Sequence, residues 1–200
     1  MAFLSEIDLK YLDIDTLYHH LIDMESKKGT IKLVPILRSS LYIALYNCIE
    51  STIYSLLEEI HDKISSMNRD QLNSKLQKKL DKLNAISSKE LSFTQIPQLK
   101  KYLKYNKLFS GNLDHRKIEQ IFKSYDIILD DFPLKARSSI KTIKDKRNIL
   151  AHGSSTFHES GRNVLSKNMK ETIDHSYMLL KEYINTVEKY LQNCRYLGSI

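Results

Sequence analysis

The sequence predicts an all-α protein, and three observations support this fold class. Glycine occurs five times and proline three times in 200 residues, too few for the frequent tight turns of a β-sandwich or β-barrel. Hydrophobic residues make up 42% of the chain, enough for a buried core. They recur at the spacing of amphipathic helices. We therefore expect one domain, residues 1–200, built as a bundle of four main helices.

The first two main helices are predicted at about residues 4–28 and 32–66. Apolar residues at helical spacing mark the first, namely Leu9, Leu12, Leu17, Leu21 and Met24. Gly29 is a typical residue for its end. The second begins near Pro35 and is apolar nearly all round between Leu41 and Ile49. Such a helix lies at the centre of a bundle or in a dimer interface.

A helical insertion of about residues 67–128 is predicted between the second and third main helices. It begins with a basic helix over about 69–87, whose apolar stripe is Leu72, Leu76, Leu80 and Leu83. Residues 88–112 have a looser pattern, and a short helix follows over about 113–127. The insertion therefore adds shorter elements to the four main helices.

The third main helix is predicted at about 133–152 and the fourth at about 165–195. Asp130 and Asp131 followed by Pro133 form a typical helix start, because acids favour the positive end of the helix dipole and proline is tolerated in the first turn. Gly153 is expected to end this helix. The polar segment 154–163 is interpreted as a loop.

Cysteine content and hydropathy indicate a cytoplasmic protein. The two cysteines, Cys48 and Cys194, form neither a zinc quartet nor a disulfide framework, and they fit a reducing compartment. No stretch approaches the roughly 18 apolar residues of a membrane span. The acids near the start do not fit a signal peptide. We expect no membrane partner.

Positive charge is concentrated in two blocks. The chain has 31 Lys and Arg against 24 Asp and Glu, and residues 63–107 alone hold eleven bases against three acids. Residues 134–152 hold six bases and one acid. Such local fields attract a polyanion such as RNA. The aromatic residues between the bases of the first block are expected to pack into the core rather than to stack on nucleobases: Phe93, Tyr102, Tyr105 and Phe109.

The segment 144–153, KDKRNILAHG, carries the candidate chemistry. On a helix, Ala136, Ile140, Ile143 and Leu150 form the apolar stripe, and the heptad step from Ile140 lands on Arg147. Burying a guanidinium is costly unless a partner pairs with it. Glu50, the acid within the apolar second helix, is the predicted partner.

His152 follows Arg147 by five residues, and Asn148 lies one helical turn before His152. A histidine for proton transfer beside an arginine for phosphate charge suits cleavage of RNA by its own 2′-hydroxyl, a reaction that requires no metal. The same residues also fit an ordinary helix end, because Arg and His followed by Gly are common there.

The segment KDKRNILAHG resembles the R-polar-x-x-x-H motif of the HEPN superfamily, whose helical domains commonly act as RNases. LYIALYNCIESTIYSLLEEI is similar to the central helix of its MAE-type branch, SGNLDHRKIEQIFKSYDI to the helix before the motif, and SSTFHESGR to the segment after it. The resemblance covers about residues 33–195. It implies a homodimer whose facing motifs form one RNA-cleaving site, in a toxin–antitoxin or phage-defence system with an antitoxin protein as a further partner.

The resemblance also assigns roles to individual residues. It implies Arg147 and His152 as the catalytic pair, Asn148 as the polar motif residue and Glu50 as the supporting acid. Lys144, Lys146 and His158 are candidates for RNA binding. Two alternatives remain open: a non-catalytic helical module that binds RNA, a nucleotide or a protein, and an interaction domain in which Arg147 and Glu50 form a structural ion pair.

No cofactor or metal is expected. The pattern Glu58-x-x-His61 occurs once, whereas a di-iron bundle requires it twice. The sequence also has no glycine-rich phosphate loop. The histidines outside the motif and its following loop are expected to face solvent: His19, His20, His61, His115 and His175.

Overall fold

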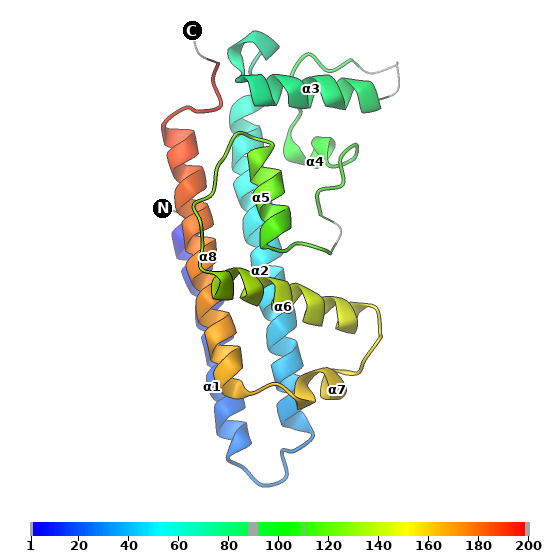
Figure 1. Cartoon of the computed structure of the whole chain (residues 1–200), viewed down its shortest axis with the longest axis vertical. Helices are drawn as coiled ribbons and strands as arrows, with labels where there is room; N and C mark the ends of the chain where they lie inside the picture. Colours follow the sequence, from blue (N-terminus) through cyan, green and yellow to red (C-terminus); the bar gives the residue numbers. More distant parts are fainter. Residues whose placement is uncertain (1, 88–91, 110, 199–200) are drawn as a thin grey trace. The chain divides into compact units, whose positions relative to one another are not determined.

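The computed structural model describes residues 2–87, 92–109 and 111–198, and these form α-helices and no β-strand (Figure 1). The α-helices are α1 (Ala2–Glu25), α2 (Leu33–Ile64), α3 (Ser74–Ile86), α4 (Leu99–Tyr102), α5 (His115–Lys123), α6 (Leu134–Ala151), α7 (Phe157–Arg162) and α8 (Ser166–Gln192). The all-α prediction is confirmed, and α1, α2, α6 and α8 are its four main helices. None of the helices described is long and apolar enough to cross a membrane.

The chain divides into two compact units. Unit 1 comprises the described parts of residues 1–52, 111–115 and 131–182, and unit 2 those of residues 53–110, 116–130 and 183–200. Apart from residues 111–115, the predicted insertion 67–128 lies in unit 2, where it packs with the last turns of α2 and α8. The segment 111–115 belongs to unit 1, which also contains the candidate motif.

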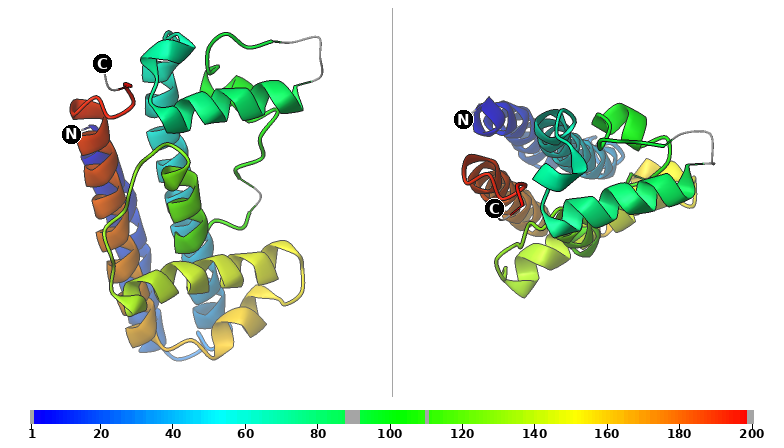
Figure 2. Two further views of the ribbon diagram at one scale, coloured as in Figure 1. Left: turned by 45° about the horizontal axis from the view of Figure 1, so that its top comes forward. Right: turned by 90° about the horizontal axis from the view of Figure 1, so that it is seen from above.

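In unit 1, α1 and the first part of α8 run side by side along α2, and α6 crosses them (Figures 1 and 2). The Tyr11 hydroxyl on α1 donates to Ser176 Oγ on α8 at 2.7 Å. The buried stripe of α1 is Ile7, Tyr11, Ile14, Tyr18 and Leu21. The predicted stripe was wrong in two positions, because Leu9 and Leu12 are 66% and 63% exposed.

The apolar stretch of α2 is explained by burial within its own unit. Leu41, Leu45 and Ile49 are completely buried, and so is Tyr46, while Asn47 is exposed. Of the two interpretations that the sequence allowed, the central bundle helix therefore accounts for this stretch.

The helix α6 begins and ends within one residue of the predicted limits, and the segment after it contains an unpredicted helix. Gly153, with φ at +66°, follows the last turn of α6 and fits the predicted helix end. Residues 154–163 were expected to be a loop, but they contain α7. A capping box begins this helix: the Glu159 N–H donates to Thr156 Oγ1, and the Thr156 N–H donates to Glu159 Oε2.

In unit 2, α5 lies along the second half of α2 and α3 crosses it (Figures 1 and 2). All four leucines predicted to form the stripe of the basic helix are at most 2% exposed, and Leu76, Leu80 and Leu83 are on α3. The helix begins later than predicted, because residues 69–71 form a 3-10 turn and Leu72 has an extended backbone. The segment expected to be loose contains the short helix α4; its residues 88–91 and 110 lie outside the described ranges.

The aromatic residues of the first basic block follow the expectation in part: Tyr102 is buried, whereas Phe93, Tyr105 and Phe109 are half-buried. Phe93 packs against Tyr105, and Phe109 packs against Tyr54. His61 contradicts its predicted exposure. Its side chain is completely buried, with Nδ1 2.7 Å from the carbonyl oxygen of Pro97 and Nε2 2.7 Å from the hydroxyl of Tyr125.

The remaining histidines follow the prediction only in part. His19 and His20 on α1 are exposed, as predicted. His115 and His175 are half-buried, which corrects the expectation for both; His115 packs edge-on against Phe132, and His175 is hydrogen-bonded to Ser139 Oγ.

Candidate functional site

Arg147 lies on the last two turns of α6, where the buried stripe of the helix gives way to a half-buried side. Ala136, Ile140 and Ile143 are completely buried, whereas Leu150 and Arg147 are half-buried. The heptad argument therefore placed Arg147 correctly toward the interior, although its guanidinium is not sealed from solvent.

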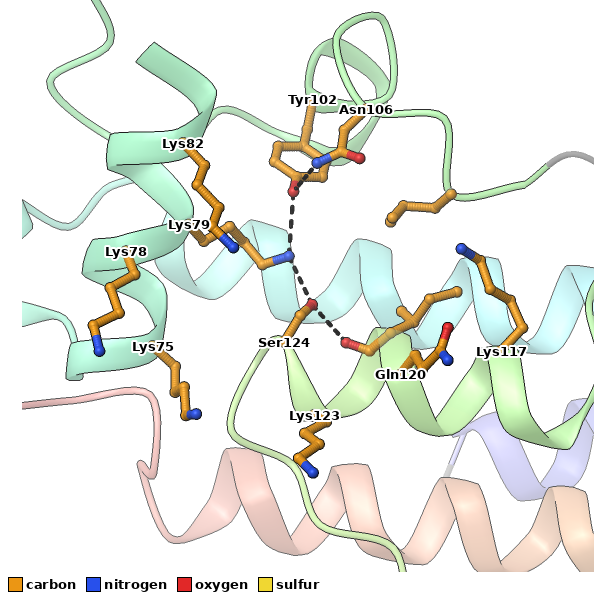
Figure 3. A pocket seen from close by; sticks show the side chains of 12 residues that line it. Lys75, Lys78, Lys79, Lys82, Tyr102, Asn106, Lys117, Gln120, Lys123 and Ser124 are labelled. Carbon is orange, nitrogen blue, oxygen red and sulfur yellow. Dashed lines mark hydrogen bonds between the residues drawn. The ribbon is translucent and has the colours of Figure 1, made fainter. Parts of the chain in front are cut away.

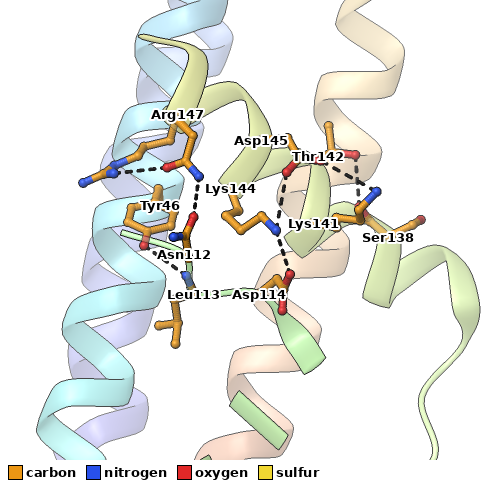
Figure 4. Close-up of polar contacts among 11 residues, drawn as sticks. Tyr46, Asn112, Leu113, Asp114, Ser138, Lys141, Thr142, Lys144, Asp145 and Arg147 are labelled. Carbon is orange, nitrogen blue, oxygen red and sulfur yellow. Dashed lines mark hydrogen bonds and ion pairs between the residues drawn. The ribbon is translucent and has the colours of Figure 1, made fainter. Parts of the chain in front are cut away.

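The guanidinium is held by an aromatic ring and an amide. Its central carbon Cζ lies 4.7 Å from the ring centroid of Tyr46 on α2, which is cation–π distance. Nη1 donates to Asn148 Oδ1 at 3.2 Å. Asn148 Nδ2 donates in turn to Asn112 Oδ1 at 2.8 Å (Figure 4). Residue 112 precedes α5, so this chain of contacts joins α2, α6 and the segment 111–115.

Gly111 lets this segment approach the guanidinium closely. Its φ is +73°, a conformation that favours glycine. A Cβ atom there would lie 2.5 Å from Nη1 of Arg147, so any side chain at this position requires the guanidinium to shift. The backbone conformation therefore favours glycine, and glycine also leaves room for the guanidinium where it lies.

The predicted ion pair between Arg147 and Glu50 is not formed. Within the residues that the structure describes, Glu50 and Arg147 make no ion pair, and the Tyr46 hydroxyl donates to Glu50 Oε1 at 3.4 Å. The same hydroxyl accepts the Leu113 N–H at 3.3 Å. Burial and the nearby carboxylate of Glu50 raise the pKa of Tyr46, and the charge of Arg147 opposes this. Tyr46 therefore contacts both Glu50 and Arg147.

His152 follows directly after α6 and is exposed. Its backbone N–H donates to the Asn148 carbonyl at 3.0 Å, which places the two residues one turn apart as predicted. Among the described residues, the imidazole of His152 makes no hydrogen bond or ion pair. Arg147 and His152 therefore lie at the same end of one helix, one held in place and one open to solvent.

The two lysines of the motif attach α6 to its neighbours. Lys144 Nζ lies 2.8 Å from Asp114 Oδ2 and 3.5 Å from Asp145, and the hydrogen bond with Asp114 raises the pKa of Lys144 (Figure 4). Lys146 donates to the Ser160 carbonyl of α7 at 2.9 Å. His158, also on α7, is half-buried and borders a pocket with Arg38 and Arg162.

Sequence reasoning missed three residues of this cluster. Tyr46, Gly111 and Asn112 contact Arg147 or its neighbour Asn148, as described above. The signals were weak but present: Tyr46 lies one turn before Glu50, and the dipeptide Gly-Asn stands just before the short helix. Neither indicated which residue would contact Arg147.

An all-α bundle with an R-polar-x-x-x-H segment at the end of one helix is typical of the HEPN superfamily. Residues 9–193 match the sequence model of the RiboL-PSP-HEPN family, and the chain belongs to this family. Comparison with curated proteins and with solved structures gave no match.

Proposed function

We propose that this protein is a metal-independent endoribonuclease with Arg147 and His152 as its catalytic pair. The observation that carries the proposal is the state of these two side chains. In the described part of the chain, the guanidinium of Arg147 has no carboxylate partner and the imidazole of His152 has no hydrogen bond. A fixed cation and an available proton carrier at the same end of one helix are two of the groups that phosphodiester cleavage uses.

The reaction is an internal transfer at phosphorus. The ribose 2′-oxygen forms a bond to the adjacent phosphorus as its proton passes to an imidazole, and the bond from phosphorus to the 5′-oxygen breaks as that oxygen receives a proton. The products are a 2′,3′-cyclic phosphate and a 5′-hydroxyl. His152 transfers the protons, and Arg147 stabilises the extra negative charge on the phosphoryl oxygens.

The supporting residues position this pair. Asn148 and Tyr46 hold the guanidinium, and Glu50 orients the hydroxyl of Tyr46. Lys146 and His158 are proposed to contact the RNA backbone. Lys144 is also proposed to contact the RNA backbone, and there a phosphate would have to compete with Asp114 for its ammonium.

A homodimer is the proposed active form, with two motifs facing one another and one or both His152 side chains in use. Exposed apolar residues support this proposal. They come from the start of α2 and the turn before it, from the end of α6 and from α7. The helix α7 contacts both α2 and α6, and the residues are Ile31, Leu33, Ile36, Ile149 and Phe157. Apolar side chains gathered beside a polar site are typical of an interface.

Incubation of the protein with total RNA in EDTA tests the activity. We expect cleavage with cyclic-phosphate and 5′-hydroxyl ends, and none from His152→Ala. His20→Ala, which replaces an exposed histidine of α1, is the matched control and should retain full activity. Circular dichroism confirms that each variant is folded.

The outcomes separate the proposal from its alternative. RNA binding without cleavage by the wild type would favour the non-catalytic helical module. Full cleavage by His152→Ala would contradict the catalytic assignment. A role in a toxin–antitoxin or phage-defence system, and a place in the MAE-type branch, are finer proposals that rest on the sequence resemblance; toxicity of the wild type on expression, absent for His152→Ala, would support the former.

A further inference from the structure

Unit 2 contains a pocket of about 480 Å³ whose wall is dominated by lysines. It lies between α3 and α5, with α4 and Asn106 at one side (Figure 3). The lysines that line it are Lys75, Lys78, Lys79, Lys82, Lys117 and Lys123, and no Asp or Glu is among the lining residues described. This volume is in the range of small-molecule sites.

One of these lysines is buried. Lys79 is only 8% exposed, and its Nζ donates to Ser124 Oγ at 2.9 Å and to the Tyr102 hydroxyl at 3.2 Å. The same nitrogen lies 3.8 Å from the ring centroid of Tyr125. Asn106 Nδ2 donates to the hydroxyl of Tyr102 at 2.7 Å. Among the residues that the structure describes, the groups that contact the Lys79 ammonium are therefore neutral.

The other lysines of α3 are exposed and unbalanced. Lys75, Lys78 and Lys82 stand on one helical face with Lys79, spaced three and four residues apart. Like charges at this spacing destabilise a helix. In the part of the chain described, none of these four makes an ion pair, and Asp81 of the same helix pairs instead with Arg69. A bound anion would offset the repulsion between these lysine charges and so explain why they stand together.

We propose that this pocket binds a ligand that carries a chain of linked phosphates, either a free oligophosphate or a nucleoside polyphosphate. Only a compact group reaches an ammonium that is almost buried at the base of a concave site. Several charges on neighbouring phosphates match several converging lysines, whereas an internal RNA phosphate carries one charge and is flanked by riboses. The amide groups of Asn106 and Gln120 add neutral hydrogen-bond donors to the same wall.

The protonation of Lys79 supplies a second signature of this site. Burial, and to a smaller extent the charge of Lys82, lowers the pKa of Lys79 to about 7. A phosphate beside the amine raises this pKa, so binding near pH 8 draws a proton onto Lys79. The titratable groups near its amine are those of Lys75, Lys78 and Lys82 on α3, Tyr102 on α4, Lys117, Lys123 and Tyr125 on and after α5, and His61 on α2.

Calorimetric titration of the full chain with sodium tripolyphosphate, in EDTA and at constant ionic strength, tests the proposal. The pocket variant is Lys78→Gln with Lys82→Gln. The matched control is Lys100→Gln with Lys104→Gln, which removes the same charge from exposed positions of unit 2 that do not line the pocket. We expect the pocket variant to lose about tenfold or more in affinity, because charge-assisted hydrogen bonds are removed, and the control to change by less than about twofold.

Further titrations distinguish the two sources of phosphate. Tighter binding of ATP than of tripolyphosphate supports a nucleoside polyphosphate, and equal affinity supports the phosphate chain alone. Lys79→Met, which keeps the length of the buried stem, should abolish the extra proton uptake at pH 8. If this variant does not fold, the two double variants still test whether tripolyphosphate binds in the pocket.

Three results would overturn the proposal. The first is absence of tripolyphosphate binding by the wild type. The second is an equal loss of affinity in both double variants, which would reflect net charge rather than a site. The third is binding of single-stranded RNA that depends on the pocket while tripolyphosphate neither binds nor competes.

Discussion

The guanidinium of Arg147 lies over the ring of Tyr46, with 4.7 Å between Cζ and the ring centroid. This contact holds a cation in place without neutralising it, because the partner is a π-system and not a carboxylate. Glu50, an acid of α2, accepts a hydrogen bond from the hydroxyl of the same tyrosine. An arginine held in this way keeps its full charge for a phosphate.

Replacing Arg147 should therefore cost activity far more than stability. For Arg147→Ala we expect a loss of about 1 kcal/mol in the free energy of unfolding, the size of a cation–π contact and a hydrogen bond at a half-buried site. A broken buried ion pair would cost roughly 3–5 kcal/mol instead. Urea unfolding measures the difference, and a loss in the higher range would mean that Arg147 has a mainly structural role.

Gly111→Ala should displace Arg147 and reduce RNA cleavage while the protein remains folded. The new methyl group would lie 2.5 Å from Nη1, so the guanidinium must shift from its position over the ring of Tyr46. Gly29→Ala is the matched control: its φ is +89°, and a Cβ there meets nothing within 4 Å. Both variants should lose about 1 kcal/mol from backbone strain.

Cleavage assays on these two variants separate strain from displacement. Activity should fall only for Gly111→Ala. Equal activity of both variants would mean that close approach of the 111–115 segment to Arg147 is unimportant for the reaction.

Periodicity predicted those parts of the fold in which one helix face meets a core. Leu76, Leu80 and Leu83 on α3 and Ala136, Ile140 and Ile143 on α6 were predicted in this way. On α1 two predicted positions were wrong, because Leu9 and Leu12 face solvent while Tyr11 and Tyr18 bury their rings on the side that meets the core. The helix α7 was missed although Thr156 and Glu159 form the sequence pattern of a capping box.

The candidate site was predictable only along its own helix. The spacing placed Arg147, Asn148 and His152 at the same end of one helix, because a helix fixes the relation between neighbouring turns. Partners from other elements depend on tertiary packing, which one sequence does not reveal. Glu50 was the predicted partner of Arg147, but the residue of α2 that contacts the guanidinium is Tyr46, one helical turn earlier. The burial of His61 beside Pro97 and Tyr125 was not predicted either.

His61 should make stability depend on pH below neutrality. Burial lowers its pKa from 6.5 to about 4 in the folded protein, and the charge of Lys79 contributes. Between these values the unfolded state binds more protons, so stability is complete above about pH 6.5 and is lost as pH falls toward 4. The size of this effect is roughly 3 kcal/mol.

Urea unfolding from pH 7 to pH 4 checks this expectation by comparison with His61→Gln. The variant keeps a neutral polar side chain, so it should lack this part of the pH dependence while retaining the part due to carboxylates. Parallel curves for the two proteins would mean that His61 keeps its ordinary pKa when folded.

Lys79 should produce a similar dependence at alkaline pH, because its pKa falls from 10.5 to about 7 on folding. Between these values the folded protein has released the proton that the unfolded chain still holds, so the stability of the wild type rises with pH from about 7 toward 10. Lys79→Met has no amine to titrate and should lack this rise. The free energy of unfolding of the variant minus that of the wild type should therefore be larger at pH 6 than at pH 9. At pH 6 the wild type must bury an ammonium, whereas at pH 9 the amine is largely neutral. Unfolding by urea at these two pH values measures the change. If the difference between variant and wild type is the same at both, the amine stays charged in the folded protein.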